Sequence, residues 1–311
     1  MIPLVMSSGD LLADRRAEYG ESCLPDNPEA ACDLYRQALE LAPDWAAGWF
    51  RLGEIRADAG INGAADAFGQ AIAADPADRL GAGLKRDLLR PKPLGDAMPA
   101  AFVEALFDQY ATSFDTHLCG QLDYRAPSLM ARSLGAGYGR MLDLGCGTGL
   151  MGEVMRPRAA YMEGWDLSAE MLRAADAKGL YDALHKCDVA QLTPAPPQWD
   201  LVTAADVFAY VGALERVVAW VGHVLLPQGQ FAFTVEAHDG PEPFRLQDSR
   251  RYAHTQKYLT DLMAHAGFEA DITAAVLRMD RGAPIRGYVV HAIRASIGSA
   301  PDRERHAEIG V

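Results

Sequence analysis

Apolar residues recur at helical spacing over two stretches of the chain. Residues 10–78 keep a period of about 3.6 and contain no convincing strand, which predicts a series of helices. Residues 101–134 open with an amphipathic run and are also predicted to be helical. Between them, the prolines of Arg90–Gly95 stop helices and mark a linker. The apolar run Met141–Leu144 then predicts a short buried strand, followed by glycines and a new helix.

The first helical stretch matches itself at an offset of 33 residues. The aligned positions are Gly20-Glu21 with Gly53-Glu54, Ala31 with Ala64, Tyr35 with Phe68, Ala38-Leu39 with Ala71-Ile72, and Pro43 with Pro76. This pattern of small and large residues resembles the tetratricopeptide (TPR) helix–turn–helix repeat. The repeat is one residue short, and Arg16 and Arg56 stand at positions where an aromatic residue is usual.

Two such repeats need a further helix to cover the end of the stack, and Arg79–Leu89 is the candidate. A TPR-like stack offers a docking surface for a partner protein or for self-association. The alternative is a helical extension that only packs on the neighbouring domain. The sequence leaves both interpretations open.

Composition and charge narrow the class of protein. The 311 residues suggest roughly two domains, and 29 Lys and Arg against 42 Asp and Glu give a net charge of −13. An acidic chain lacks the basic surface that nucleic acid or an anionic membrane requires. Five cysteines without a C-x-x-C pair argue against disulfides or structural zinc, and no signal peptide or membrane span is apparent. We therefore expect a cytoplasmic protein that binds neither nucleic acid nor membrane.

The run Asp143-Leu-Gly145-Cys-Gly147-Thr-Gly149 carries the clearest chemical signal. The glycines allow a sharp turn in which the backbone can approach a ligand, ahead of a helix with an electropositive N-terminus. Gly147, Gly149 and Gly152 also satisfy G-x-G-x-x-G, a weak dinucleotide signal. However, a pyrophosphate has no use for a carboxylate at position 143, whereas a ligand with a cationic amino-acid group does.

This motif resembles the first motif of class I S-adenosylmethionine (SAM)-dependent methyltransferases, and the resemblance extends over about residues 101–295. It implies an α/β, Rossmann-like sheet of seven strands, preceded here by an all-α TPR-like domain. The resemblance also implies that Asp166, 23 positions after Asp143, accepts both ribose hydroxyls, and that residues near Asp188 bind adenine. A dehydrogenase would need a second nucleotide-binding half or a separate catalytic domain, and neither is visible.

We expect SAM to be the cofactor, and the domains to be 1–90 (TPR-like helices with their capping helix), 91–135 (linker and lid helices), 136–296 (SAM-binding domain) and 297–311 (a flexible tail). The predicted cofactor contacts are Asp143, Gly145, Cys146, Gly147, Gly149, Asp166, Leu167, Met171, Asp188, Val189, Ala205 and Tyr110. The segments 106–111, 114–115, 122–125 and 251–254, together with the repeats, are similar to bacterial TPR-containing methyltransferases. That resemblance implies no single acceptor.

Methyl transfer needs alignment of the two reactants, exclusion of water and, for a neutral acceptor, removal of a proton. Tyr110 lies in a predicted helix that we expect to cover the cofactor, although packing on the core would explain it equally well. Asp206 ends the predicted fourth strand, where ligands bind in such sheets, and is a candidate base or orienting group. Tyr210 on the next turn is a weaker catalytic candidate. The alternative for Asp206 is a carboxylate that caps a loop.

Residues 244–257 carry a net positive charge in an otherwise acidic chain, with four cations and one carboxylate. They follow the predicted fifth strand, where related enzymes often build the acceptor pocket. We predict that Arg251, Tyr252 and His254 bind the acceptor, with His254 as a further candidate catalytic base. The alternative is a solvated turn. The other histidines show no metal-ligand spacing, so no metal site is predicted.

Three functions remain open. The first is methyl transfer from SAM by in-line displacement to a small molecule, for which an anion is one option. The second is a protein methyltransferase that recruits its target through the TPR-like helices. The third is a SAM-binding adaptor without catalysis, against which the intact motif of Asp143, the glycines and Asp166 argues.

Overall fold

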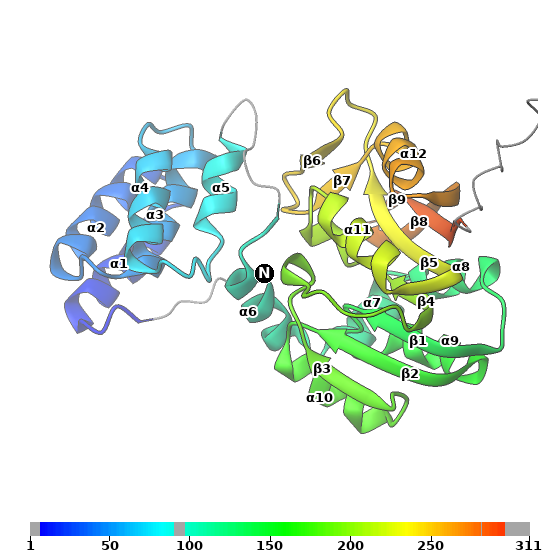
Figure 1. Cartoon of the computed structure of the whole chain (residues 1–311). Coiled ribbons are helices and arrows are strands. Elements are labelled where there is room, and N and C mark those ends of the chain that lie inside the picture. Colours follow the sequence, from blue (N-terminus) through cyan, green and yellow to red (C-terminus); the bar gives the residue numbers. More distant parts are fainter. Residues whose placement is uncertain (1–6, 90–96, 281, 296–311) are drawn as a thin grey trace, which may run out of the picture.

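The N-terminal region is all helical in the computed structural model, which describes residues 7–89, 97–280 and 282–295. Its helices are α1 (Leu11–Cys23), α2 (Pro28–Leu41), α3 (Ala46–Asp58), α4 (Ala64–Ala74) and α5 (Ala82–Leu88). Asp10 and Asn27 cap the first two helices by accepting backbone N–H bonds. α1 packs on α2, α3 on α4, and α5 on α4 (Figure 1). The predicted helical stretch and its covering helix are therefore confirmed.

Close approach between α3 and α4 depends on a small residue facing a large one. Phe68 is fully buried, and its ring fills the space beside Gly53. A Cβ atom at position 53 would lie 2.6 Å from that ring. The Gly–Phe pair that the repeat pattern aligns therefore sets the distance between the two helices.

Beyond the linker, three helices precede the sheet: α6 (Ala100–Tyr110), α7 (Phe114–Gln121) and α8 (Ala126–Ser133). The strands are β1 (Tyr138–Leu144), β2 (Ala159–Asp166), β3 (Ala183–Lys186), β4 (Trp199–Ala204), β5 (Leu225–Ala237), β6 (Phe244–Leu246), β7 (Tyr252–His254), β8 (Phe268–Asp280) and β9 (Ala283–Arg294). Between them lie the helices α9 (Leu150–Met155), α10 (Ala169–Lys178), α11 (Glu215–Val224) and α12 (Gln256–His265). Short 3-10 turns occupy Arg156–Arg158, Val189–Gln191 and Phe208–Tyr210.

The strands form one mixed sheet, ordered β3-β2-β1-β4-β5-β7-β6 (Figure 1). β1 to β5 run parallel, and β9 pairs antiparallel with β5 and with β8. The parallel strands place their carboxyl ends at one edge, where ligands bind in open α/β sheets. The α/β class and the Rossmann-like order are confirmed.

The predicted count of seven strands is wrong, because the structure has nine in this sheet. The two further strands are β6 and β7, which form a short hairpin within the basic segment 244–257. β7 pairs with the last two residues of β5, beyond the residues of β5 that pair with β4. Buried Leu246 and Tyr252 hold the hairpin against its neighbours.

Helices cover both faces of the sheet. Leu142 and Leu144 of β1 point into a core shared with α11 and α12, whereas Met141 points into a core shared with α8 and α9. This alternation within one apolar run is typical of a strand that is buried on both sides. α8, which we had grouped with the lid, therefore contributes to the core of the sheet domain. None of the described helices is both long and apolar enough to cross a bilayer.

α6 lies between the N-terminal helices and the sheet domain (Figure 1). Its Phe102 shares an apolar cluster with Leu84 of α5 and with Leu246 and Tyr252 of the hairpin. Gly81, at a φ of +70°, leaves room for the Phe102 ring, since a Cβ there would lie 2.9 Å from it. The N-terminal helices therefore support the helix that the sequence assigned to the lid.

Gly53 and Gly69 are a matched pair for testing the spacing of α3 and α4. Gly53→Ala should lower the free energy of unfolding by about 1–2 kcal/mol, because overpacking against Phe68 exceeds the gain in helix propensity. Gly69→Ala, with no atom within 4 Å of the added methyl group, should raise it by about 0.5–1 kcal/mol. Urea unfolding followed by circular dichroism measures both. Equal stabilisation by the two substitutions would contradict this packing.

Candidate active site

The glycine loop follows β1 and brings its backbone against the ends of two other strands. Gly145 has a φ of +63°, and a Cβ there would lie 2.4 Å from Val207 after β4. The N–H groups of Gly145 and Cys146 donate to the carbonyl oxygen of Trp165 on β2. Only glycine satisfies both constraints at position 145.

Asp143 is 1% exposed and lies on β1 just before this loop. It accepts hydrogen bonds from the hydroxyls of Tyr181 (2.7 Å) and Thr203 (2.8 Å). Burial raises its pKa to about 7, which these two hydrogen bonds only partly oppose. No cation contacts it among the described residues. A buried carboxylate of this kind is suited to a ligand that brings its own positive charge.

Asp166 ends β2 and joins the glycine loop to α10. One carboxylate oxygen accepts from the N–H of Gly147 (2.8 Å) and the other from the N–H of Ser168 (2.8 Å). Burial raises the pKa of Asp166, and these backbone bonds oppose that shift. After β3, Asp188 accepts from the N–H of Ala190 at 2.8 Å. Three consecutive parallel strands thus deliver carboxylates to one edge of the sheet.

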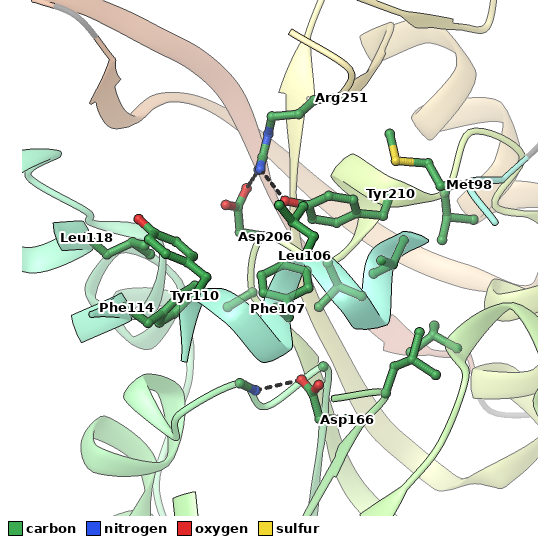
Figure 2. Close-up of a pocket in the computed structure, with 18 of the residues that line it drawn as sticks. Met98, Leu106, Phe107, Tyr110, Phe114, Leu118, Asp166, Asp206, Tyr210 and Arg251 are labelled. Carbon is green, nitrogen blue, oxygen red and sulfur yellow. Dashed lines mark hydrogen bonds and ion pairs between the residues drawn. The ribbon is translucent and has the colours of Figure 1, made fainter. Parts of the chain in front are cut away.

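One cavity of about 1290 Å³ joins these groups to the next strand ends. The predicted site residues that line it are Asp143, Gly145, Cys146, Gly147, Asp166, Leu167, Asp188, Val189, Ala205, Asp206, Tyr210, Arg251 and Tyr110. Figure 2 shows Asp206, Tyr210 and Arg251 opposite α6, with Asp166 at a separate part of the wall. The structure therefore brings most of the predicted residues together around one space.

Four predicted residues do not line the cavity: Gly149, Met171, Tyr252 and His254. Gly149 precedes α9 at a φ of +94°, and Met171 is a buried residue of α10. Tyr252 is buried in the cluster with Phe102. These residues belong to the elements that surround the cavity, but they do not line it.

The predicted position of His254 is wrong. Its side chain is fully buried, and Nε2 donates to the carbonyl oxygen of Gly212 at 2.8 Å. Burial lowers its pKa to about 4. A neutral, enclosed imidazole that packs against Phe244 and Tyr258 holds the hairpin in place and cannot reach an acceptor.

Arg251 belongs to a charged cluster with partners that the sequence analysis missed. Its Nη2 lies 2.7 Å from Asp206, and its Nε donates to Glu236 on β5. Arg278 on β8 contacts the same two carboxylates. Glu236 and Arg278 each interrupt an apolar run in a strand, and that pattern is the signal that could have found them.

α6 and α7 form the wall opposite these strand ends. They contact both the loop after β2 and the glycine loop. Asp108 accepts from the hydroxyl of Ser168 at 2.5 Å, next to Asp166. Asp115 pairs with Lys178 at 2.7 Å and accepts from Thr148 in the glycine loop. Glu104 of α6 forms a further ion pair with Lys186 at the end of β3. These contacts hold α6 and α7 against the cavity.

The lid side of the cavity is aromatic. Phe107 packs edge-on against Tyr210, and Phe114 against both Phe107 and Tyr110 (Figure 2). The Tyr110 hydroxyl bonds to Nδ1 of His117, which also lines the cavity. The sequence analysis did not identify His117, because its only signal is the helical spacing of seven residues from Tyr110.

Comparison with known proteins agrees with this geometry. Residues 142–233 match a family model described as a methyltransferase domain. Malonyl-[acyl-carrier protein] O-methyltransferase of Enterobacter lignolyticus is 32% identical over 138 residues, 44% of this chain and 54% of that one. A ubiquinone biosynthesis O-methyltransferase of Klebsiella pneumoniae is 30% identical over 107 residues, 32% of this chain and 44% of that one. The chain spans about half the length of the curated relatives it matches.

Among solved structures, a SAM-dependent methyltransferase from Mesorhizobium loti is 22% identical; the match covers 55% of this chain and 97% of that one, with a TM-score of 0.45. The family match falls on the sheet and its cavity, outside the N-terminal helices. Residues 142–233 are therefore similar to a methyltransferase domain, and SAM is the cofactor expected there. The residues present fit that cofactor, since Asp143 offers a buried negative charge and the glycine loop leaves space against the backbone.

The raised pKa of Asp143 predicts a pH dependence for cofactor binding. An ammonium group favours the ionised carboxylate, so affinity is full about one pH unit or more above 7, is about halved at pH 7 and falls further as the carboxyl becomes protonated below it. The dissociation constant for SAM should rise about fivefold from pH 7 to pH 6 and about tenfold over the next unit. Calorimetric titration measures this. Asp143→Asn should bind weakly with a flat profile, and a flat profile for the unsubstituted protein would refute the assignment.

Proposed function

We propose that this protein transfers the methyl group of SAM to an oxygen atom of a small acceptor. The observation that carries the proposal is one cavity with two kinds of wall. Strand-end carboxylates and the glycine loop form one part, and the cluster around Asp206 and Arg251 forms another. Two curated relatives are named as O-methyltransferases, which supports oxygen as the acceptor atom.

The cofactor part of the cavity offers three complementary contacts. Asp143 would pair with the ammonium of the methionine moiety, and Asp166 would accept the ribose hydroxyls through the lone pairs that its backbone bonds leave open. Asp188 and Val189 would bind adenine. When bound, SAM supplies an electrophilic methyl group on a sulfonium ion, so the protein has to position the acceptor and exclude water.

The acceptor part lies at the end of β4. Asp206 has a φ of +61°, an unusual backbone geometry for a residue other than glycine, and its N–H donates to the hydroxyl of Thr234. Its carboxylate contacts two arginines, which favours a positioning role over the removal of a proton. Tyr210 presents its hydroxyl beside them and would contact the acceptor. Tyr110 and Phe107 would exclude water from above.

The N-terminal helices are proposed to be a TPR-like stack that supports the lid. The packing of Phe102 against Gly81 and Leu84 favours this role. Recruitment of a partner protein, self-association, a protein acceptor and a non-catalytic adaptor remain the alternatives. Turnover on small molecules by the isolated protein would separate the leading function from a protein acceptor and from a non-catalytic adaptor.

Incubation with methyl-labelled SAM and a small-molecule cell extract tests the proposal. The protein should transfer label to one or a few small molecules. Asp166→Ala should lower this transfer about 100-fold or more at low SAM concentration, because the carboxylate holds both the ribose site and the glycine loop. Asp176→Ala, an exposed carboxylate on α10, serves as the control and should match the unsubstituted protein. Binding of SAM without any transfer of label would contradict the proposal.

A further inference from the structure

The charged cluster beside Asp206 is a closed set of two cations and two carboxylates. Asp206 lies 2.7 Å from Nη2 of Arg251 and 3.3 Å from Nη1 of Arg278. Glu236 accepts from the same two arginines, from Arg278 at 2.5 Å. Glu236 is 3% exposed, and the Arg278 side chain is 7% exposed. The four charges cancel, so this part of the wall contributes no net charge to the reaction.

A free base is missing from the same part of the cavity. A hydroxyl acceptor loses a proton during methylation and needs a group to take it. Asp206 and Glu236 are both paired with arginines, and His254 lies outside the cavity. His117 lines the cavity on α7, where its Nδ1 is hydrogen-bonded to the Tyr110 hydroxyl. Asp248 and Asp280 also line the cavity, but they are exposed to solvent. Within the described residues, the wall beside Asp206 therefore favours an acceptor that is already ionised.

Hydrogen-bond donors gather there instead. The Tyr210 hydroxyl accepts from Nη1 of Arg251 at 2.8 Å, which leaves its own proton to donate (Figure 2). Tyr124 lines the same cavity, and burial raises the pKa of both phenols. Both therefore remain protonated donors at neutral pH. Nη2 of Arg251 is buried. It lies close enough to Asp206 to form an ion pair, but it makes no hydrogen bond among the described residues.

A further part of the wall is apolar. Side chains from α6 and α7 and from the segments just before α6 and just after α7 line it: Met98, Phe102, Val103, Leu106, Leu118 and Leu122. Such a wall suits an aliphatic or aromatic body and gives no partner to a polar one. The cavity thus combines one group of donors with a large apolar surface.

We infer that the acceptor is a carboxylate on an apolar body, that Arg251, Arg278 and the two phenols hold its head group, and that the product is a methyl ester. The inference rests on the proposed function and names its substrate class. An oxygen lone pair of the carboxylate forms the bond to the methyl carbon, while the carbon–sulfur bond breaks and its electron pair stays on sulfur. No proton moves. The negative carboxylate and the positive sulfonium become a neutral ester and a neutral thioether.

The chemistry of the labelled product tests this directly. After incubation of the full chain with methyl-labelled SAM and the small-molecule extract, mild alkali should release most of the transferred label as methanol. Methyl ethers and methylamines keep their label under these conditions. Alkali-stable label would overturn the carboxylate assignment and leave the methyltransferase proposal standing. Absence of transfer would contradict both.

Arg278 has a matched control in Arg286, which is exposed on the neighbouring strand β9. Arg278→Met should lower kcat/KM for the alkali-labile product at least about thirtyfold, with the dissociation constant for SAM changed less than about twofold. Arg286→Met should change neither. Equal kcat/KM in the two variants would overturn the assignment, as would an equal loss of SAM binding by Arg278→Met.

A conservative variant keeps the test valid if Arg278→Met does not fold. Arg278→Lys keeps a cation beside Glu236 and so preserves the buried ion pair, but an ammonium has fewer N–H donors than a guanidinium to offer the acceptor. The expected result is a raised KM for the acceptor with unchanged SAM binding. An unchanged KM would count against a role in holding the acceptor.

Discussion

The cost of burying carboxylates at one edge of the sheet determines how this site is built. A buried charge needs a partner, and the structure supplies a different kind of partner at each strand end. Hydroxyls serve Asp143, backbone N–H groups serve Asp166, and arginines serve Asp206. Only Asp143 lacks both a cation and a backbone donor, so it gains most from a cationic ligand. The division of the cavity into a cofactor part and an acceptor part follows from these differences.

The lid connects this site to the N-terminal helices. α6 contributes Asp108 to the start of α10 and Phe102 to the cluster with α5. A change in the N-terminal helices therefore reaches the cavity through the same helix that covers it. For this reason, removal of residues 1–90 does not separate recruitment of a partner from catalysis, because it also removes the packing behind Phe102. Point substitutions on the outer face of the stack are the appropriate way to study docking.

The sequence predicted the parts of the site that depend on local patterns. The strand, the glycine turn and the acidic residue at each strand end lie within short segments, so Asp143, Asp166 and Asp188 could be recognised together. Contacts between side chains on different strands of the sheet could not be predicted from such local patterns. Arg278 meets Glu236 only because β9 lies between β8 and β5. His254 shows the converse error: a basic segment suggested a pocket, but β7 turns its last side chain into the core.

The central claim is that cofactor and acceptor meet in one cavity between the glycine loop and the arginine cluster. A crystal structure with S-adenosylhomocysteine tests it most directly. We predict the amino group of the ligand beside Asp143, the ribose on Asp166, and the sulfur atom facing the space between Asp206 and the lid. A ligand whose sulfur points away from the arginine cluster, or that binds outside this cavity, would contradict the account.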